Sequence, residues 1–372
     1  MKFINYFILF FLFSCSSIES NDEEIQLLVA GNADSTTKSK IPTNSLSFIR
    51  LETKSESLLS YIINIDITKE FCYVLDRSTL FKFNLDGSFI SKIPRGKGPG
   101  EIEFPLNFKF NKERNEIYII EMGNKLHVYD NNLNYKRTFI LDGSFVDVLR
   151  LDDDHFLLCS ALVGDYEPYL VSKFSIKNES IVEKYLSMDN NPMKDLHILT
   201  FNNFQIFNDN IYLTVSNSRF IYEFNDNKMS SVYQISFNNY EPPLEYIKRF
   251  RKTRAFRKIT YKDQLVSFVN FYYQFKEFAL LGIKHKKYNC GIKFKDDNSI
   301  YLSDISYLFD LPTTKSFEMP RSFGENKIHF IYNNDILHEN NQLKESSLLY
   351  IRNDSLLIRQ NENPIIVTIS IK

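Results

Sequence analysis

The stretch PRGKGPGEIEFPLNFKFNKERNEIYIIEMGNKLHVYD (residues 94–130) decides the fold. Its first part suits a tight connection, because glycine tolerates positive φ and proline has a fixed φ. Beyond it, apolar residues alternate with polar ones in segments 106–110, 116–121, 126–129 and 135–140, with turn residues between them. Short strands joined by tight turns predict one four-stranded antiparallel unit, the repeating blade of a β-propeller.

The third segment of this unit recurs along the chain. LHVYD (126–130) has counterparts in LFKFN (80–84), VSKFS (171–175) and IYEFN (221–225), and in SYLFD (306–310) once a helical insertion is subtracted. The spacing of about 45–50 residues is the period of propeller blades, and it is too long for most helical or leucine-rich repeats. The repeat predicts an all-β fold, a six-bladed β-propeller of four-stranded antiparallel blades.

Turns rich in Asn and Asp set the expected blade boundaries. The predicted blades cover residues 61–94, 105–140, 145–186, 204–237, 289–319 and 327–372. Residues 46–51 are expected to close the ring by joining the last blade, because a propeller must hide its edges. A count of five or seven blades stays open.

The pattern changes between residues 241 and 287. Pro242 and Pro243 end the β pattern, and apolar residues then follow helical spacing up to Tyr273, which predicts an insertion of one or two helices. Its first half, residues 248–258, is strongly basic. Such a cluster suits contact with an anionic partner such as lipid headgroups, lipopolysaccharide or an acidic glycan. The favoured interpretation is a solvated helix whose aromatic face packs on the propeller.

The N-terminus predicts a lipoprotein signal peptide over residues 1–14. Lys2 precedes an apolar run of about eleven residues, which is too short to span a bilayer. The run ends in LFSC (12–15), and the thiol of Cys15 would receive the diacylglyceryl group before cleavage. We expect a flexible tether over residues 15–42 and the propeller over 43–372. The predicted location is the outer membrane, on its periplasmic side or at the cell surface; an ordinary secretory signal is the alternative.

The composition excludes several classes of protein. The formal net charge of −1 argues against a nucleic-acid partner. Cys72, Cys159 and Cys290 remain once Cys15 is lipidated, and their odd number and spacing favour buried thiols over a disulfide framework or zinc site. The histidines lack metal-ligand spacing, and the chain has no nucleophile elbow, Walker loop or dinucleotide fingerprint. We therefore predict no catalytic residue, no metal site and no cofactor.

One blade also resembles a known repeat. GPGE (98–101), FP (104–105), IYIIE (117–121) and NKLHVYD (124–130) are similar to one NHL repeat of the six-bladed propellers. Glu121 stands where that repeat usually has Asp, and Lys125 where it usually has Arg. Together with the leader, the chain resembles bacterial six-bladed propeller lipoproteins of the NHL-like group. The resemblance implies the fold and transfers no catalytic residue.

Any binding site is expected on one face of the ring. The connections between blades share that face with the loops between second and third strands, and loops on a rigid scaffold usually carry binding. The candidate ligand-binding residues are Arg95, Lys97 and Glu101 in the first inter-blade connection, and Arg77, Glu121, Asn124 and Arg219 in the loops.

Two functional hypotheses follow. The first is a membrane-anchored, non-catalytic propeller that binds a protein, peptide or glycan partner in the cell envelope. The second is a metal-dependent hydrolase or lyase, with a cation such as Ca²⁺ at the centre of the channel. It requires carboxylates such as Asp66, Asp147 and Asp304 to converge there.

Overall fold

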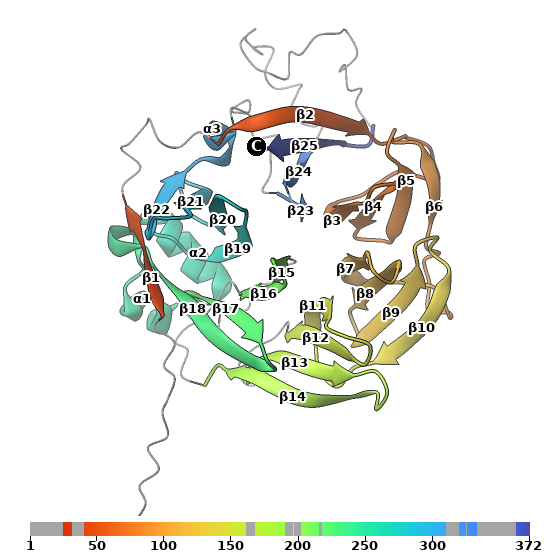
Figure 1. Ribbon diagram of the computed structural model, residues 1–372, viewed down its shortest axis with the longest axis horizontal. Coiled ribbons are helices and arrows are strands. Elements are labelled where there is room, and N and C mark those ends of the chain that lie inside the picture. The colour runs from red at the N-terminus through yellow and green to blue at the C-terminus, as the bar shows by residue number, and fades with distance from the viewer. Residues whose placement is uncertain are drawn as a thin grey trace, which may run out of the picture.

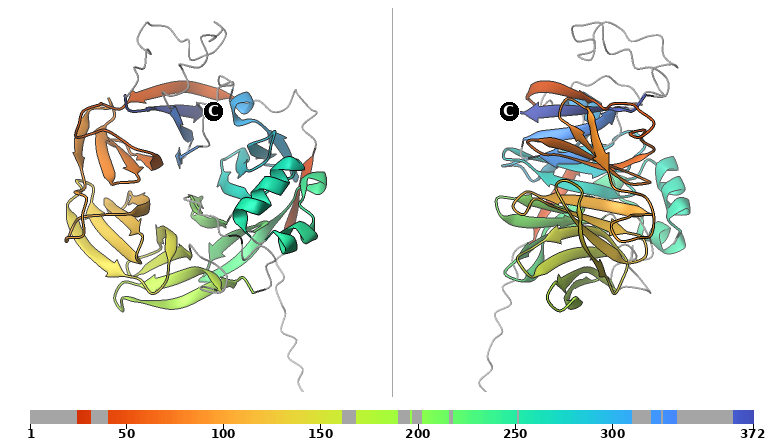
Figure 2. Two further views of the ribbon diagram at one scale, coloured as in Figure 1. Left: turned by 180° about the vertical axis from the view of Figure 1, so that it is seen from behind. Right: turned by 90° about the vertical axis from the view of Figure 1, so that its right-hand side faces the viewer.

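The computed structural model describes residues 25–31, 41–160, 168–189, 196, 202–215, 218–250, 252–309, 320–324, 326–332 and 362–372. In this part of the chain, sheets stand around a central axis like the blades of a propeller (Figure 1). Seen edge-on, the ring is a disc, and helices lie on one of its faces (Figure 2). The predicted β-propeller fold is confirmed, whereas the predicted signal peptide and Cys15 lie outside the described residues.

Three sheets follow the chain from an inner strand to an outer strand. The first contains β3 (Ile62–Ile67), β4 (Phe71–Asp76), β5 (Leu80–Asn84) and β6 (Phe89–Lys92). The second contains β7 (Pro105–Asn111), β8 (Glu116–Glu121), β9 (Lys125–Asp130) and β10 (Tyr135–Ile140). The third contains β11 (Phe145–Arg150), β12 (His155–Ser160), β13 (Tyr169–Ser175) and β14 (Ser180–Ser187). All neighbouring strands in these sheets are antiparallel.

A fourth sheet joins the two ends of the chain. It contains β23 (Ser322–Gly324), β24 (Lys327–Tyr332), β25 (Ile365–Ile371) and, on the outside, β2 (Thr43–Arg50). β2 runs antiparallel to β25 in a register that pairs Thr43 with Ile371 and Arg50 with Ile365. The prediction that residues 46–51 add a strand to the last sheet is confirmed up to Arg50.

The remaining strands form one nine-stranded sheet. Its first group is β15 (Phe204–Phe207), β16 (Asn210–Thr214), β17 (Phe220–Asn225) and β18 (Lys228–Ser236), and its second is β19 (Val269–Gln274), β20 (Phe278–Ile283), β21 (Cys290–Phe294) and β22 (Ser299–Ser303). Between the outer strands of these groups lies β1 (Gln26–Gly31), which pairs in parallel with both β18 and β22. β1 therefore joins two antiparallel groups into a continuous sheet.

β1 corrects the predicted tether. Residues Gln26–Gly31 were assigned to a flexible segment, but Leu28 and Ala30 are buried in the core between the two strand groups. The Nδ2 of Asn238 also donates to the Ala30 carbonyl oxygen at 3.1 Å. The polar composition of the surrounding residues concealed this short apolar strand.

The predicted helical insertion is partly wrong. Two helices, α1 (Leu244–Arg249) and α2 (Thr253–Lys262), follow the short 3₁₀ helix η1 (Asn238–Tyr240), but Val269–Gln274 and Phe278–Ile283 are strands β19 and β20. β20 is buried along its whole length, so its sequence shows no alternation of polar and apolar residues. The fifth strand group therefore begins at Val269, whereas residue 289 was predicted.

The basic insertion packs as a solvated helix pair. Phe256 of α2 is fully buried beside Phe268, with their ring centroids 5.5 Å apart, and most of its basic neighbours are exposed. α1 and α2 lie on one face of the disc (Figure 2). No helix in the described part of the chain is long and apolar enough to cross a membrane.

The recurring segment marks a third strand in four places. Residues 80–84, 126–130, 171–175 and 221–225 coincide with β5, β9, β13 and β17. The proposed fifth copy at 306–310 is wrong, since Ile305–Leu308 form helix α3; the third strand there is β21. Cys72, Cys159 and Cys290 are free and buried, as predicted.

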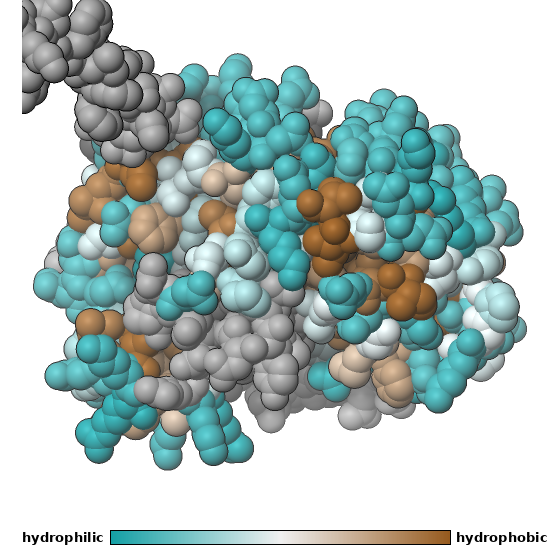
Figure 3. Space-filling model, turned by 90° about the horizontal axis from the view of Figure 1, so that it is seen from below, coloured by the Kyte–Doolittle hydropathy of each residue, from teal (hydrophilic) through white to brown (hydrophobic). Residues whose placement is uncertain are grey.

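The rim of the disc is formed by outer strands. Their exposed positions include Lys92 in β6, Lys136 in β10 and Lys184 in β14. Figure 3 shows that hydrophilic residues cover much of one side of the rim and leave separate hydrophobic patches. Charged side chains on outer strands disfavour pairing with another chain, so the open sheet edges are protected.

Candidate functional site

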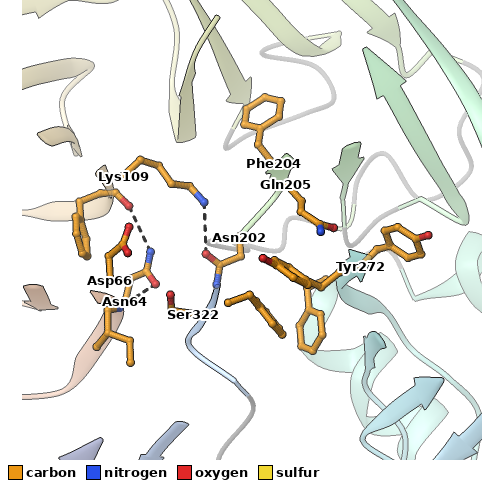
Figure 4. Close-up of a pocket in the computed structure, with 13 residues that line it drawn as sticks. Asn64, Asp66, Lys109, Asn202, Phe204, Gln205, Tyr272 and Ser322 are labelled. Atoms are coloured by element: carbon orange, nitrogen blue, oxygen red, sulfur yellow. Dashed lines mark hydrogen bonds between the residues drawn. The ribbon is translucent and has the colours of Figure 1, made fainter. Parts of the chain in front are cut away.

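A cavity of about 160 Å³ lies in the central channel (Figure 4). We call it the channel pocket. It is lined by residues of five inner strands and the residue Asn202 before β15: Asn64, Ile65, Asp66, Phe108, Lys109, Asn202, Phe204, Gln205, Phe271, Tyr272, Tyr273, Ser322 and Phe323. Because the lining comes from strands far apart in sequence, only the closed ring brings these side chains together.

A bulge recurs near the start of four inner strands. The register shifts just before Asn64 in β3, Asn107 in β7, Asp147 in β11 and Phe271 in β19. In the first three, the side-chain oxygen accepts the N–H of the following residue at 2.9 Å. Bulges re-aim side chains, and here they turn polar groups toward the neighbouring inner strand.

These polar groups form a chain from strand to strand. Asn64 Nδ2 donates to Asn107 Oδ1 at 2.9 Å, and Asn107 Nδ2 donates to Asp147 Oδ1 at 2.9 Å. Asp147 Oδ2 then accepts the backbone N–H groups of Asn203 at 2.8 Å and Phe204 at 3.2 Å. Four neighbouring inner strands are thus fixed to one another beside the pocket.

Lys109 and Asp66 bring opposite charges to the pocket. Lys109 Nζ lies 3.7 Å from Asp147 Oδ2 and donates to Asn202 Oδ1 at 3.5 Å (Figure 4). Burial raises the pKa of the Asp66 carboxyl, while the positive charges of Lys109 and Lys112 oppose that shift. Burial likewise raises the pKa of Asp147, against Lys109 and the backbone N–H groups that the carboxylate accepts. The charge of Lys109 therefore stabilises the ionised form of both carboxylates.

Aromatic rings and an amide form the opposite side. Tyr273 and Phe323 stack with ring centroids 4.2 Å apart, and Phe271 lies 5.0 Å from Phe323. Tyr273 Oη donates to the Gly324 carbonyl oxygen at 3.0 Å, which fixes its ring. Gln205 is held by two hydrogen bonds to the backbone of Gln274, at 2.8 and 2.9 Å. The pocket therefore combines hydrogen-bond donors and acceptors on one side with a rigid apolar wall on the other.

The candidate residues chosen from the sequence lie elsewhere. Arg77, Arg95, Lys97 and Asn124 are exposed in the loops, and Asn124 has a positive φ of 64° that suits its place in a tight turn. Glu101 Oε2 accepts the Gly98 N–H at 2.8 Å and so closes its own loop. None of these residues lines the channel pocket.

Glu121 is an internal structural residue and is only 3% exposed. Its carboxylate accepts the backbone N–H groups of Glu103 and Phe104 and meets His127 Nε2 at 2.8 Å. Although burial alone would raise the pKa of Glu121, these donors lower it below its usual value. The carboxylate ties the connection before β7 to the end of β8, so its prediction as a ligand-binding residue is not supported by this geometry.

Arg219 is also occupied by structural contacts. Its Nε donates to Glu241 Oε1 at 2.8 Å, and its Nη2 donates to the Val266 carbonyl oxygen at 2.9 Å. Glu241 and Val266 flank the helix pair α1 and α2, so Arg219 fixes the ends of the insertion against the ring.

The three carboxylates proposed for a central cation do not converge. Asp66 faces the pocket and Asp147 is buried beside it, but Asp304 caps helix α3 by accepting the Ser306 N–H at 2.9 Å. Across the described residues, no group of three or more His, Cys, Asp or Glu side chains is placed to hold a metal ion. The predicted convergence is therefore wrong for Asp304.

Sequence reasoning missed most of the pocket. Lys109, Asn202, Gln205 and Tyr273 carry no motif, and Tyr273 was assigned to a helix. A signal was nevertheless present, because Asn64, Asn107 and Asp147 each occupy the third position of an inner strand. A polar residue repeated inside otherwise apolar inner strands indicates the channel wall.

Antiparallel sheets arranged around a channel define this protein as a β-propeller. The chain belongs to the family described as a domain of unknown function, DUF4934, whose model matches residues 23–370. Comparison with curated proteins gave no match.

Solved structures agree with the fold. A protein of Bacteroides fragilis NCTC 9343, provisionally described as exported, is 18% identical with a TM-score of 0.70, over 94% of this chain and 99% of that one. A protein of unknown function from Bacteroides caccae is 7% identical (TM-score 0.44, 67% of this chain and 83% of that one). The Neurospora crassa Pan2 WD40 domain is 11% identical (TM-score 0.41, 83% and 75%). At 18% identity the similarity to the Bacteroides fragilis protein shows the fold alone. The other two structures have TM-scores below 0.5 and add no further support.

Proposed function

We propose that this protein is a non-catalytic, six-bladed propeller lipoprotein of the NHL-like group that binds a glycan in the bacterial cell envelope. Four sheets of four strands and the two strand groups joined by β1 support the count of six blades. The repeat-like residues of β8 and β9 support the resemblance to the NHL group. The glycan is the partner class, among protein, peptide and glycan, that the channel pocket favours.

The composition of the channel pocket is the observation that supports binding of a glycan. Asp66, Lys109, Asn202 and Gln205 supply charged and amide groups, which suit hydroxyls that both donate and accept hydrogen bonds. Rings such as Tyr273 suit the C–H face of a sugar, which packs on aromatic surfaces. The cavity of about 160 Å³ is smaller than the roughly 300–1,000 Å³ of drug-sized sites, so it matches one sugar unit.

This function is tested by measuring binding to neutral mono- to trisaccharides. An array identifies which saccharides bind, and titration calorimetry then measures their affinities. The variant Asp66→Asn should weaken binding by about tenfold or more, because a hydrogen bond to a charged group contributes about 1.5–3 kcal/mol. Glu70→Gln, an exposed change in the turn between β3 and β4, is the matched control and should bind like the natural protein. Equal affinity of the Asp66→Asn variant, or no binding to any saccharide, would contradict the proposal.

The lipid anchor rests on the leader sequence and is tested separately. Cells that express the full chain are grown in medium with labelled palmitate. The membrane fraction of these cells should then contain the labelled protein. The Cys15→Ser variant should lose the label, because serine has no thiol to accept the diacylglyceryl group. A label retained by this variant would rule out Cys15 as the anchor.

A further inference from the structure

Two arginines surround one exposed tyrosine. The Cζ of Arg77 lies 4.7 Å from the centroid of the Tyr61 ring, and the Cζ of Arg321 lies 5.3 Å from it. Arg321 Nη2 also donates to Tyr61 Oη at 3.0 Å, and the Arg77 backbone N–H donates to the Tyr61 carbonyl oxygen at 3.2 Å. Tyr61 is 48% exposed and Arg77 is exposed, whereas Arg321 is half-buried beneath them. We call these residues the arginine pair and its tyrosine.

The arginine pair lies where the inner strands begin. Tyr61 immediately precedes β3 and Arg321 immediately precedes β23, and these inner strands are neighbours in the ring (Figure 1). The Arg321 carbonyl oxygen accepts Asn202 Nδ2 at 3.0 Å, and Asn202 lines the channel pocket. Tyr61 is three residues before Asn64, or about 10 Å along an extended strand. The pair therefore stands at the mouth of the channel, next to Asn202 and Ser322 of the pocket lining.

The carboxylate nearest in sequence is already engaged elsewhere. Asp76 Oδ1 accepts from Ser78 and from the Thr79 N–H, and its Oδ2 accepts the N–H and the hydroxyl of Ser60, each at 2.6–2.9 Å. Asp76 is only 1% exposed. Within the described residues, no carboxylate oxygen lies within 4.0 Å of an Arg77 side-chain nitrogen. Among the described residues, the Arg77 guanidinium therefore contacts the Tyr61 ring and forms no ion pair.

We infer that the arginine pair binds a carboxylate of an oligosaccharide that extends into the channel, so that one of its other sugar units occupies the channel pocket. Arginine presents a planar set of N–H donors that matches the two oxygens of a carboxylate. Lys109 deeper in the channel is balanced by Asp66 and Asp147, so the arginine pair is the part of this site that would attract an anion. This inference rests on the proposed glycan binding and names its class as an acidic oligosaccharide.

Trigalacturonate and its methyl ester test the inference, because they share the sugar chain and differ in the charge of their carboxyl groups. The natural protein should bind the acid about tenfold or more tightly than the ester. The Arg77→Gln/Arg321→Gln variant should bind both forms equally, at the affinity of the ester. Arg137→Gln is the control, since Arg137 also lies over an aromatic ring, 4.4 Å from the centroid of Phe139, but on outer strand β10. It should keep the preference for the acid.

Salt gives a second measurement that needs no variant. The preference of the natural protein for the acid should shrink between 50 and 500 mM NaCl, because salt screens exposed charges. If acid and ester bind equally at low salt, the inference is overturned while glycan binding stands. If the double variant keeps the preference, the arginine pair is not the site. If neither form binds, the inference fails, and the neutral saccharides above decide the proposed function independently.

Discussion

A chain that begins at Glu52 is expected to fail to fold, because it lacks the closing strand β2. Without β2, strand β25 presents an open edge that is apolar and buried in the intact ring. Leu46 and Phe48 of β2 also pack against the core between β25 and its neighbouring sheet. An open, apolar edge pairs readily with other chains. Circular dichroism and size-exclusion chromatography should therefore show an unfolded or aggregated protein.

A chain that begins at Ile41 is the matched control, because it lacks β1 and keeps β2. It should fold with a free energy of unfolding lowered by about 2–4 kcal/mol, since Leu28 is fully buried and Ala30 nearly so. Adding a synthetic peptide of residues 41–51 to the shorter chain should restore part of the folded signal. A folded, monomeric protein starting at Glu52 would show that β2 does not close the ring.

Replacing Asp147 with Ala should lower the free energy of unfolding by about 3–5 kcal/mol. The carboxylate is fully buried, and its loss removes the acceptor for Asn107 Nδ2 and for the backbone N–H groups of Val148 and Asn203. Lys109 would also lose the anion 3.7 Å from its ammonium group. Buried donors without acceptors cost more than the net value of the bonds themselves. Urea denaturation followed by fluorescence or circular dichroism measures the change.

Asp142→Ala is the control for this experiment. Asp142 is an exposed carboxylate in the connection that leads into the same strand, β11, so its loss should change stability by less than about 0.5 kcal/mol. The Asp147→Asn variant keeps the shape and should fall between the two. If Asp147→Ala unfolds at the same urea concentration as Asp142→Ala, the polar chain between the inner strands does not stabilise the ring.

Local patterns predicted much of the fold correctly where strands alternate or end in tight turns. The segments at 80–84 and 126–130 coincide with β5 and β9, because turn residues fix their ends whatever the sheets pack against. Val269–Gln274 was predicted as helix because its apolar residues fall at helical spacing, and Phe278–Ile283 because β20 is buried along its whole length and shows no alternation. Apolar residues at helical spacing cannot then be told from a continuous apolar strand.

The candidate site was harder to predict than the fold. Asp66 was selected for a metal site, but its neighbour in the channel is the cation of Lys109, from another sheet. Loop residues such as Glu121 were selected from the usual role of loops, yet Glu121 satisfies backbone N–H groups of the adjoining connection. Contacts between sheets depend on how the ring closes, and no short stretch of sequence contains that information.

The direction of β1 has a consequence for how the disc would stand above a membrane. β1 runs parallel to β18, whose end leads into η1 and then α1 and α2, so the chain enters β1 from the opposite face. The ten residues between Cys15 and Gln26 reach at most about 35 Å. With the proposed anchor at Cys15, this short linker would keep the face at which the chain enters β1 close to the lipid. The helix pair and the arginine pair would then point outward, toward long polymers that cannot approach the bilayer.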